Sequence, residues 1–189
     1  TGSDALAVAT DRCVDRIEAR AKDAVVACRL AVRRARVASM DPLALSARAD
    51  TAGRIAQRNA GTLSAHVEFL TSDWFNALAG RRFDLIVSNP PYIAAADVHL
   101  TRGDVRFEPP TALAAGIDGL DDLRRLATAA GPHLKPGGRL LLEHGHDQGA
   151  VCRALLQQAG FSGVTTLRDL AGLDRVTLGD LAAQPMGKP

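Results

Sequence analysis

The chain has 189 residues, of which 47% are hydrophobic and 23% charged, and its formal net charge is +2. This length suits one ordinary domain with a sizeable core, and we expect a single domain over residues 1–189 with residues 181–189 as a tail. The near-neutral net charge gives no indication that the protein as a whole binds nucleic acid or a membrane surface. A local basic cluster remains, at Arg29, Arg33, Arg34 and Arg36. Because no aromatic residues interleave with it, a solvated helix face is favoured over an RNA-binding patch.

The cysteines and the hydrophobic runs predict the compartment. Cys13, Cys28 and Cys152 are far apart and form no Cys-x-x-Cys pair. This usage is typical of a reducing compartment and argues against both a disulfide framework and a zinc site. No apolar run is long enough to span a bilayer, and the N-terminus lacks a signal-peptide pattern. We therefore expect a cytoplasmic protein that binds neither membrane nor metal.

The N-terminal third is expected to be largely helical. Residues 4–41 contain no glycine or proline, and apolar residues recur in them at helical spacing, at Val14, Ile17, Ala21 and Val25. Two short stretches within this region, residues 24–28 and 36–40, are alternative candidates for a strand. Further on, residues 54–60 predict a helix that ends before Gly61, and residues 67–70 predict a short strand.

Residues 83–92 read Phe-Asp-Leu-Ile-Val-Ser-Asn-Pro-Pro-Tyr and are the most informative stretch of the chain. The apolar run predicts a buried parallel strand that stops at Asn89. Proline cannot donate to a sheet and restricts the residue before it, so Asn89 and Pro90 are expected in a stiff extended turn. Ligands of open α/β sheets bind just outside the carboxyl ends of the strands. An exposed amide followed by a proline carbonyl at that place suits the binding of an NH₂ group, although the same residues can simply end a strand.

The second half of the chain alternates helices and strands. Residues 93–119 are rich in Asp, Gly and Pro and are expected to form loops beside the site, and residues 120–134 predict an amphipathic helix. A turn at 135–138 then leads into a strand over 139–143, and residues 148–160 predict a helix closed by Gly160. The last elements expected are paired strands over 164–167 and 175–178. His144 and His146 form a His-x-His pair without a spaced third ligand, so we expect a surface loop rather than a metal site.

These motifs together resemble one enzyme family. The Asn-Pro-Pro-Tyr turn after an apolar strand resembles the amino-methylating methyltransferases that use S-adenosyl-L-methionine (AdoMet). The residues that follow, Gly-Asp-Val-Arg-Phe-Glu-Pro at 103–109, Ala112-Leu113 and Asp-Gly-Leu at 118–120, resemble the PrmC/HemK family of protein-(glutamine-N5) methyltransferases, which act on peptide chain release factors. The resemblance covers residues 54–180 and implies a Rossmann-like class I α/β methyltransferase sheet with helices on both faces.

The resemblance also implies roles for individual residues. Asn89, Pro90 and Tyr92 would hold the target glutamine amide for methyl transfer, and Pro91 and Glu108 would complete the substrate site. The cofactor would be AdoMet, bound by Gly2, Asp41, Asp73, Trp74 and Asn89. Asp73 would accept from the adenine amino group and Trp74 would pack against the base; the alternative is an Asp N-cap with a core tryptophan. The partner would be a release factor, with a monomeric enzyme and no direct nucleic-acid contact required.

The N-terminal residues depart from the family pattern. Residues 1–9 resemble only the back half of the family's glycine-rich cofactor loop, with Asp4 where the family has glycine, and the first strand is expected to be missing. Thr1–Ser3 can alternatively be a cloning remnant. Residues 1–53 thus predict an incomplete or divergent cofactor half, in which the ribose-binding acid is Asp41 if residues 36–40 are the strand. A negative charge beside the AdoMet carboxylate would weaken binding.

Three alternatives in function therefore stay open. One is an adenine-N6 DNA methyltransferase, which would use a similar turn but ordinarily carries a basic target-recognition region. Another is a catalytically impaired relative of the glutamine methyltransferases. A third, within the family, is a glutamine methyltransferase that acts on a ribosomal protein.

Overall fold

The computed structural model describes residues 53–54, 57–59, 61–62, 67–70, 72–97 and 113–183. These residues belong to two compact units, one that comprises residues 28–81 and one that comprises residues 1–27 and 82–189. The expected missing first strand, and the strand candidates at 24–28 and 36–40, lie outside the described residues. The assignment of one domain to residues 1–189 stays a prediction.

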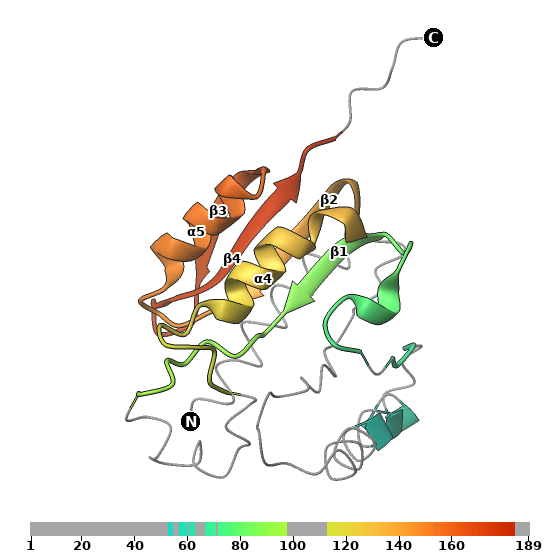
Figure 1. Ribbon diagram of the computed structural model, residues 1–189, viewed down its shortest axis with the longest axis horizontal. Coiled ribbons are helices and arrows are strands. Elements are labelled where there is room, and N and C mark those ends of the chain that lie inside the picture. The colour runs from blue at the N-terminus through green and yellow to red at the C-terminus, as the bar shows by residue number, and fades with distance from the viewer. Residues whose placement is uncertain are drawn as a thin grey trace. The chain divides into compact units, whose positions relative to one another are not determined.

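The unit that begins at Arg82 contains a four-stranded mixed sheet with the strand order β1-β2-β4-β3 (Figure 1). β1 (Phe83–Ser88) and β2 (Leu134–Glu143) are parallel, and their connection passes through a helix. β3 (Phe161–Arg168) and β4 (Asp174–Leu181) form an antiparallel hairpin that adds to β2 through β4. The predicted parallel strand that stops at Asn89 and the predicted C-terminal strand pair are both confirmed.

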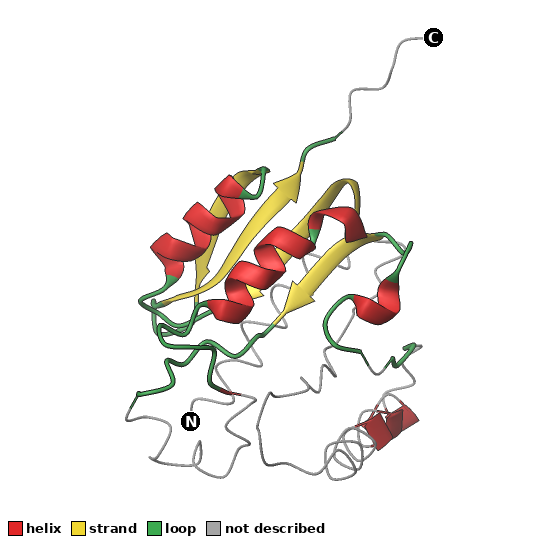
Figure 2. Cartoon of the chain, in the orientation of Figure 1, coloured by secondary structure: helices red, strands yellow, loops and turns green. Residues whose placement is uncertain are grey.

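Two helices lie on the same face of this sheet in Figures 1 and 2, α4 (Asp121–Ala129) and α5 (Gly149–Gln158). Both are amphipathic, and their apolar sides pack with the sheet residues into one core. Five leucines in this core are at most 2% exposed: Leu123, Leu126, Leu140, Leu142 and Leu156. The core therefore fixes the direction in which β1 and β2 end, and so the position of the loops that follow them.

Two predicted boundaries in this unit are wrong. The helix expected over residues 120–134 ends at Ala129 and is followed by a 3₁₀ turn, Gly131–His133, because Pro132 cannot continue a helix and restricts Gly131 before it. The turn expected at 135–138 lies inside β2. Phe83 pairs with Leu134 and Leu85 pairs with Arg139. Residues 135–138 therefore form an irregularity within the ladder rather than a turn before the strand.

The described part of the unit that ends at Arg81 carries less regular structure. Residues 53–54, 57–59 and 61–62 are helical, so the prediction that Gly61 stops this helix is wrong. Residues 67–70 are not a strand either: Val67 and Leu70 are each 38% exposed and find no ladder partner among the described residues. A short 3₁₀ helix, η1 (Asn76–Leu78), follows the Ser72–Phe75 segment.

Candidate active site at the end of strand β1

The Asn-Pro-Pro-Tyr turn leaves β1 with its prolines buried and its asparagine exposed. Pro90 and Pro91 are among the fully buried side chains of the described residues, whereas Asn89 is exposed. The turn lies at the carboxyl end of β1, beside the carboxyl end of the parallel strand β2, where ligands of α/β sheets bind. The two prolines therefore anchor the turn in the core, and Asn89 is presented from a rigid base.

Backbone hydrogen bonds hold the exit of the turn. Ile93 N–H donates to the Leu113 carbonyl at 2.9 Å, and Ala115 N–H donates to the Ile93 carbonyl at the same distance. Ala95 N–H donates to the Gly116 carbonyl, also at 2.9 Å. These bonds form a parallel bridge between the segment after Tyr92 and the segment before Asp118. The two ends of the loop predicted to wall the substrate site are thus tied together next to the turn.

Tyr92 is fixed by a carboxylate from the neighbouring strand. Its hydroxyl donates to Glu143 Oε1 at 3.3 Å, and Glu143 is the last residue of β2. Burial raises the pKa of the Tyr92 phenol above its usual range, and the negative charge of Glu143 adds to this shift. Burial likewise raises the pKa of Glu143. Tyr92 therefore stays a neutral phenol at physiological pH. It can act as a hydrogen-bond donor and as an aromatic packing surface, but not as a base.

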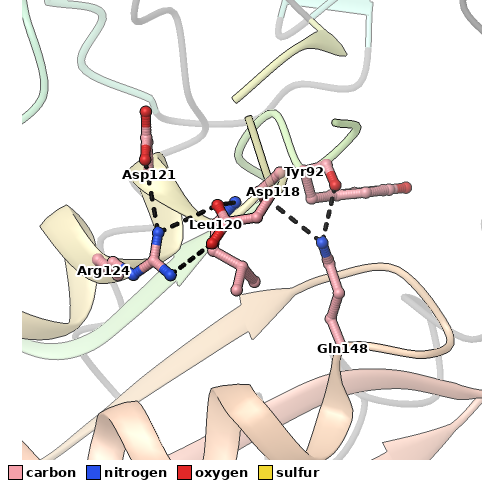
Figure 3. Close-up of polar contacts among 7 residues, drawn as sticks. Tyr92, Asp118, Leu120, Asp121, Arg124 and Gln148 are labelled. Carbon is pink, nitrogen blue, oxygen red and sulfur yellow. Dashed lines mark hydrogen bonds and ion pairs between the residues drawn. The ribbon is translucent and has the colours of Figure 1, made fainter. Parts of the chain in front are cut away.

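Gln148 joins the turn to two further loops (Figure 3). Its Nε2 donates to the Tyr92 carbonyl at 2.9 Å and to the Gly119 carbonyl at 3.4 Å, while its Oε1 accepts from Gly145 N–H at 2.9 Å. Gln148 is the N-cap residue of α5, directly after the β2 loop. A single amide thus links the exits of β1 and β2 with the Asp118–Leu120 segment.

The Asp-Gly-Leu motif at 118–120 is a tight turn against the same site. The Asp118 carboxylate accepts from Leu120 N–H at 3.1 Å and from two nitrogens of Arg124, which lowers the pKa of Asp118 (Figure 3). Gly119 has a φ of +74°, and a Cβ there would stand 2.5 Å from the Tyr92 carbonyl oxygen. Only glycine provides both the left-handed conformation and the close approach.

Sequence reasoning missed three residues of this site: Gly119 in its contact role, Glu143 and Gln148. A signal existed for Glu143, because it is the last residue of a strand and so lies at the same edge as Asn89. Gly119 stood in a recognised motif, but its neighbour Tyr92 is far away in the chain. Gln148 gave no local signal beyond a polar residue before a helix.

The expected cofactor residues fall in separate places. Gly2, Asp41 and the substrate residue Glu108 lie outside the described residues. Trp74 is only 9% exposed and has a φ of +54°, a left-handed conformation that a bulky residue rarely adopts. The N-cap residue of η1 is Phe75, without a side-chain cap hydrogen bond, and Ser72 Oγ accepts from Ala77 N–H at 2.9 Å. A carboxylate and an indole suit the amino group and the ring of adenine, and these two roles stay predictions.

His144 corrects the expectation of a surface loop. Its side chain is fully buried, whereas His146 is exposed. His144 Nδ1 donates to the Gly145 carbonyl at 2.7 Å, and Nε2 accepts from Thr177 Oγ1 at 2.8 Å, so both nitrogens are satisfied in the neutral ring. The two histidines therefore do not form a metal pair, and no group of three or more His, Cys, Asp or Glu able to hold a metal occurs in the described part of the chain.

We expect His144 to make the protein lose stability in mild acid. Burial lowers its pKa below the ordinary 6.5, so the unfolded chain takes up this proton before the folded chain does. Stability from this group is therefore complete above pH 6.5 and is lost as pH falls through the lowered pKa. Urea unfolding measured over this range should show a shallower pH dependence for His144→Gln than for the unsubstituted protein. His146→Gln is the matched control, and equal slopes for the two variants would contradict the prediction.

Comparisons with known proteins agree with this geometry. Residues 25–105 match the family model for the methyltransferase small domain. Release factor glutamine methyltransferases of Xylella fastidiosa and Pseudomonas aeruginosa are 60% and 57% identical to this chain over 126 and 136 residues. These alignments cover 66% and 71% of this chain and 46% and 49% of the two relatives, so the chain spans about half the length of the curated relatives that it matches.

Among solved structures, a release-factor-specific protein-(glutamine-N5) methyltransferase from Alicyclobacillus acidocaldarius aligns at 27% identity, over 62% of this chain and 66% of that chain, with a TM-score of 0.40. The alignments with the curated relatives extend over about two thirds of this chain, and the residues matched by the family model include the Asn-Pro-Pro-Tyr turn. Over about two thirds of its length this chain is homologous to release factor glutamine methyltransferases, and its fold is Rossmann-like α/β.

Proposed function

We propose that the protein transfers a methyl group from AdoMet to the side-chain amide nitrogen of a glutamine in a peptide chain release factor, in its Gly-Gly-Gln loop. The observation that carries this proposal is the exposed Asn89 on a turn whose two prolines are buried. The turn offers the Asn89 side-chain oxygen and the Pro90 carbonyl as two acceptors for one NH₂ group. The similarity to release factor glutamine methyltransferases supports the choice of a glutamine amide as that group.

The chemistry asked of this chain is to hold and orient a weak nucleophile. AdoMet, when bound, supplies an already electrophilic methyl group. An amide nitrogen is a poor nucleophile because its lone pair is delocalised into the carbonyl. Acceptors at Asn89 and Pro90 that engage both N–H groups would turn the lone pair toward the methyl, and positioning of this kind supplies up to roughly 7 to 11 kcal/mol in ideal cases. The neutral phenol of Tyr92 would line the slot, and the amide proton leaves to water.

The cofactor of the proposed reaction would be AdoMet. Asp73 and Trp74 have the side-chain chemistry that adenine requires, and Gly2 and Asp41 would face the methionine and ribose portions. The described site residues thus fit AdoMet in kind. No helix among the described residues is long and apolar enough to cross a membrane. A translation factor as substrate also agrees with the reducing compartment that the cysteine usage predicts.

A substrate assay tests the proposal directly. The chain is incubated with isotope-labelled AdoMet and either a Gly-Gly-Gln loop peptide, the same peptide with Gln replaced by Asn, or duplex DNA. We expect methylation of the Gln peptide alone, with the added methyl on the side-chain nitrogen by tandem mass spectrometry. Methyladenine in the DNA with an unmodified peptide would instead identify an amino-group DNA methyltransferase. The absence of transfer to both, with intact AdoMet binding, would contradict the proposed substrate.

A further inference from the structure

The Gln148 amide is oriented by its partners and cannot be reversed without loss. Gly145 N–H can only donate and therefore needs Oε1, whereas the Tyr92 and Gly119 carbonyls can only accept and therefore need Nε2. All three contacts are satisfied by one orientation of the side chain. The Nε2 group consequently points at the Tyr92 carbonyl, two residues after the Pro90 carbonyl of the proposed amide grip (Figure 3).

Gly145, which orients the Gln148 amide, is itself held by a series of hydrogen bonds. Gly145 offers its N–H to Gln148 and its carbonyl to the buried His144. His144 in turn accepts from Thr177 Oγ1, which is 2.9 Å from Thr166 Oγ1, and Thr166 accepts from Arg153 at 2.8 Å. Because Arg153 can only donate and the Gly145 carbonyl can only accept, each hydrogen bond in the series from Arg153 to Gly145 has one direction. The Gly145 peptide is thereby held rigidly from the hairpin β3–β4 and helix α5.

We propose that Gln148 is a positioning residue of the methyl-transfer site, which sets the Asn-Pro-Pro-Tyr turn by donating to the Tyr92 carbonyl. This inference rests on the proposed function, because it assigns Gln148 to the same amide grip. The buried prolines fix the start of the turn, and Gln148 fixes its end against the loops after β2 and before α4. A displacement of about 1 Å in a reacting group costs on the order of a hundredfold in rate.

Two substitutions at Gln148 separate the role of its Nε2 donor from that of its Oε1 acceptor. Gln148→Ala removes both and should lower kcat for peptide methylation by about ten- to a hundredfold, with the KM for AdoMet changed by less than about threefold. Gln148→Glu keeps an oxygen for Gly145 N–H, but as a carboxylate it cannot donate to Tyr92. When protonated it has one O–H donor in place of the two N–H donors of the amide, which is enough to donate to the Tyr92 carbonyl while the other oxygen accepts from Gly145 N–H.

The test is the pH dependence of each variant's kcat divided by that of the unsubstituted protein. For Gln148→Glu this ratio should rise as pH falls from about 8 to about 5, because a carboxyl that faces carbonyls has a raised pKa. For Gln148→Ala the ratio should stay low and flat. Gln157→Glu, an exposed glutamine on the same helix, is the matched control for the added charge and should keep a ratio near one. A flat, unchanged ratio for both Gln148 variants overturns the proposal.

A second readout does not depend on activity. Tyr92 is the single tyrosine of the chain, so ¹³C-tyrosine labelling yields one set of ring signals from the turn itself. We expect these signals to shift or broaden in Gln148→Ala, and to return toward their original position when Gln148→Glu is acidified. Ring signals that respond in a protein without peptide methylation would overturn the proposed function and leave the positioning of the turn supported. Signals identical to those of the unsubstituted protein in both variants would overturn the positioning role.

Discussion

Asn89→Ala is expected to reduce methyl transfer by roughly a hundred- to a thousandfold, comparable to the removal of one preorganised hydrogen-bonding group from an oxyanion hole. The turn itself should persist, because Pro90 and Pro91 anchor it in the core and the Asn89 side chain is exposed. The loss should therefore appear in kcat, whereas the affinity for AdoMet should change only several-fold. Single-turnover methylation of the Gly-Gly-Gln peptide and calorimetric titration with AdoMet measure the two quantities separately.

Asn89→Asp is the informative companion to this variant. It keeps a side-chain oxygen as acceptor at the same distance from the backbone, so it should retain more activity than Asn89→Ala while it falls short of the unsubstituted protein. Near-normal turnover with alanine at position 89 would show that the Asn89 oxygen does not hold the amide. A large loss of AdoMet affinity in both variants would instead assign Asn89 to the cofactor.

Gly119→Ala is expected to be the most disruptive small substitution in the described part of the site. The added Cβ would stand 2.5 Å from the Tyr92 carbonyl oxygen and 3.0 Å from both Ala94 N and Gln148 Nε2. Two of these neighbours are backbone atoms, so the turn must shift to make room. The left-handed φ adds roughly 1 to 2 kcal/mol of strain, and we expect a total loss of about 2 to 4 kcal/mol in the free energy of unfolding.

Gly172→Ala separates the two contributions to this loss. Gly172 has a φ of +78°, nearly the same as Gly119, but a Cβ there would meet nothing within 4 Å. It should therefore show the backbone strain alone, about 1 to 2 kcal/mol, with unchanged methyl transfer. Gly119→Ala should be less stable than Gly172→Ala in urea unfolding and should also lose activity. Equal stability and equal turnover of the two variants would show that the contact between Gly119 and the turn is unimportant.

The organisation of the site explains why these effects are expected to differ in kind. The Asn89 side chain is exposed, so its replacement should act mainly on the chemistry. Gly119 and Gln148 act on the Tyr92 carbonyl from two sides, one by close approach and one by a hydrogen bond. Their loss should be geometric. The turn thus holds the Asn89 side chain in a fixed position, and contacts with segments remote in the chain make the turn rigid.

Local sequence was sufficient to predict the strand and the turn at the centre of the candidate site. A short apolar run closed by two prolines favours a buried strand with an abrupt end, so β1 and its turn were predictable from residues 83–92. The C-terminal hairpin was predictable in kind, and the similarity to glutamine methyltransferases was visible from the same turn and the motifs after it. Boundaries were less certain, because the end of α4 and the irregular start of β2 depend on how Gly131-Pro132 and residues 135–138 are packed.

The contacts that support the turn come from residues far away in the chain. Tyr92 forms hydrogen bonds with Glu143 and Gln148, which follow it by 51 and 56 residues. The buried His144 forms a hydrogen bond with Thr177, 33 residues further on. No local period or spacing encodes such contacts, because they arise when β2 and β4 pair and α5 packs beside them. His144 therefore looked like part of a surface loop, and Gln148 carried no signal at all. The Asn-Pro-Pro-Tyr turn was visible in the local sequence, whereas the residues that hold it in place depended on which strands became neighbours.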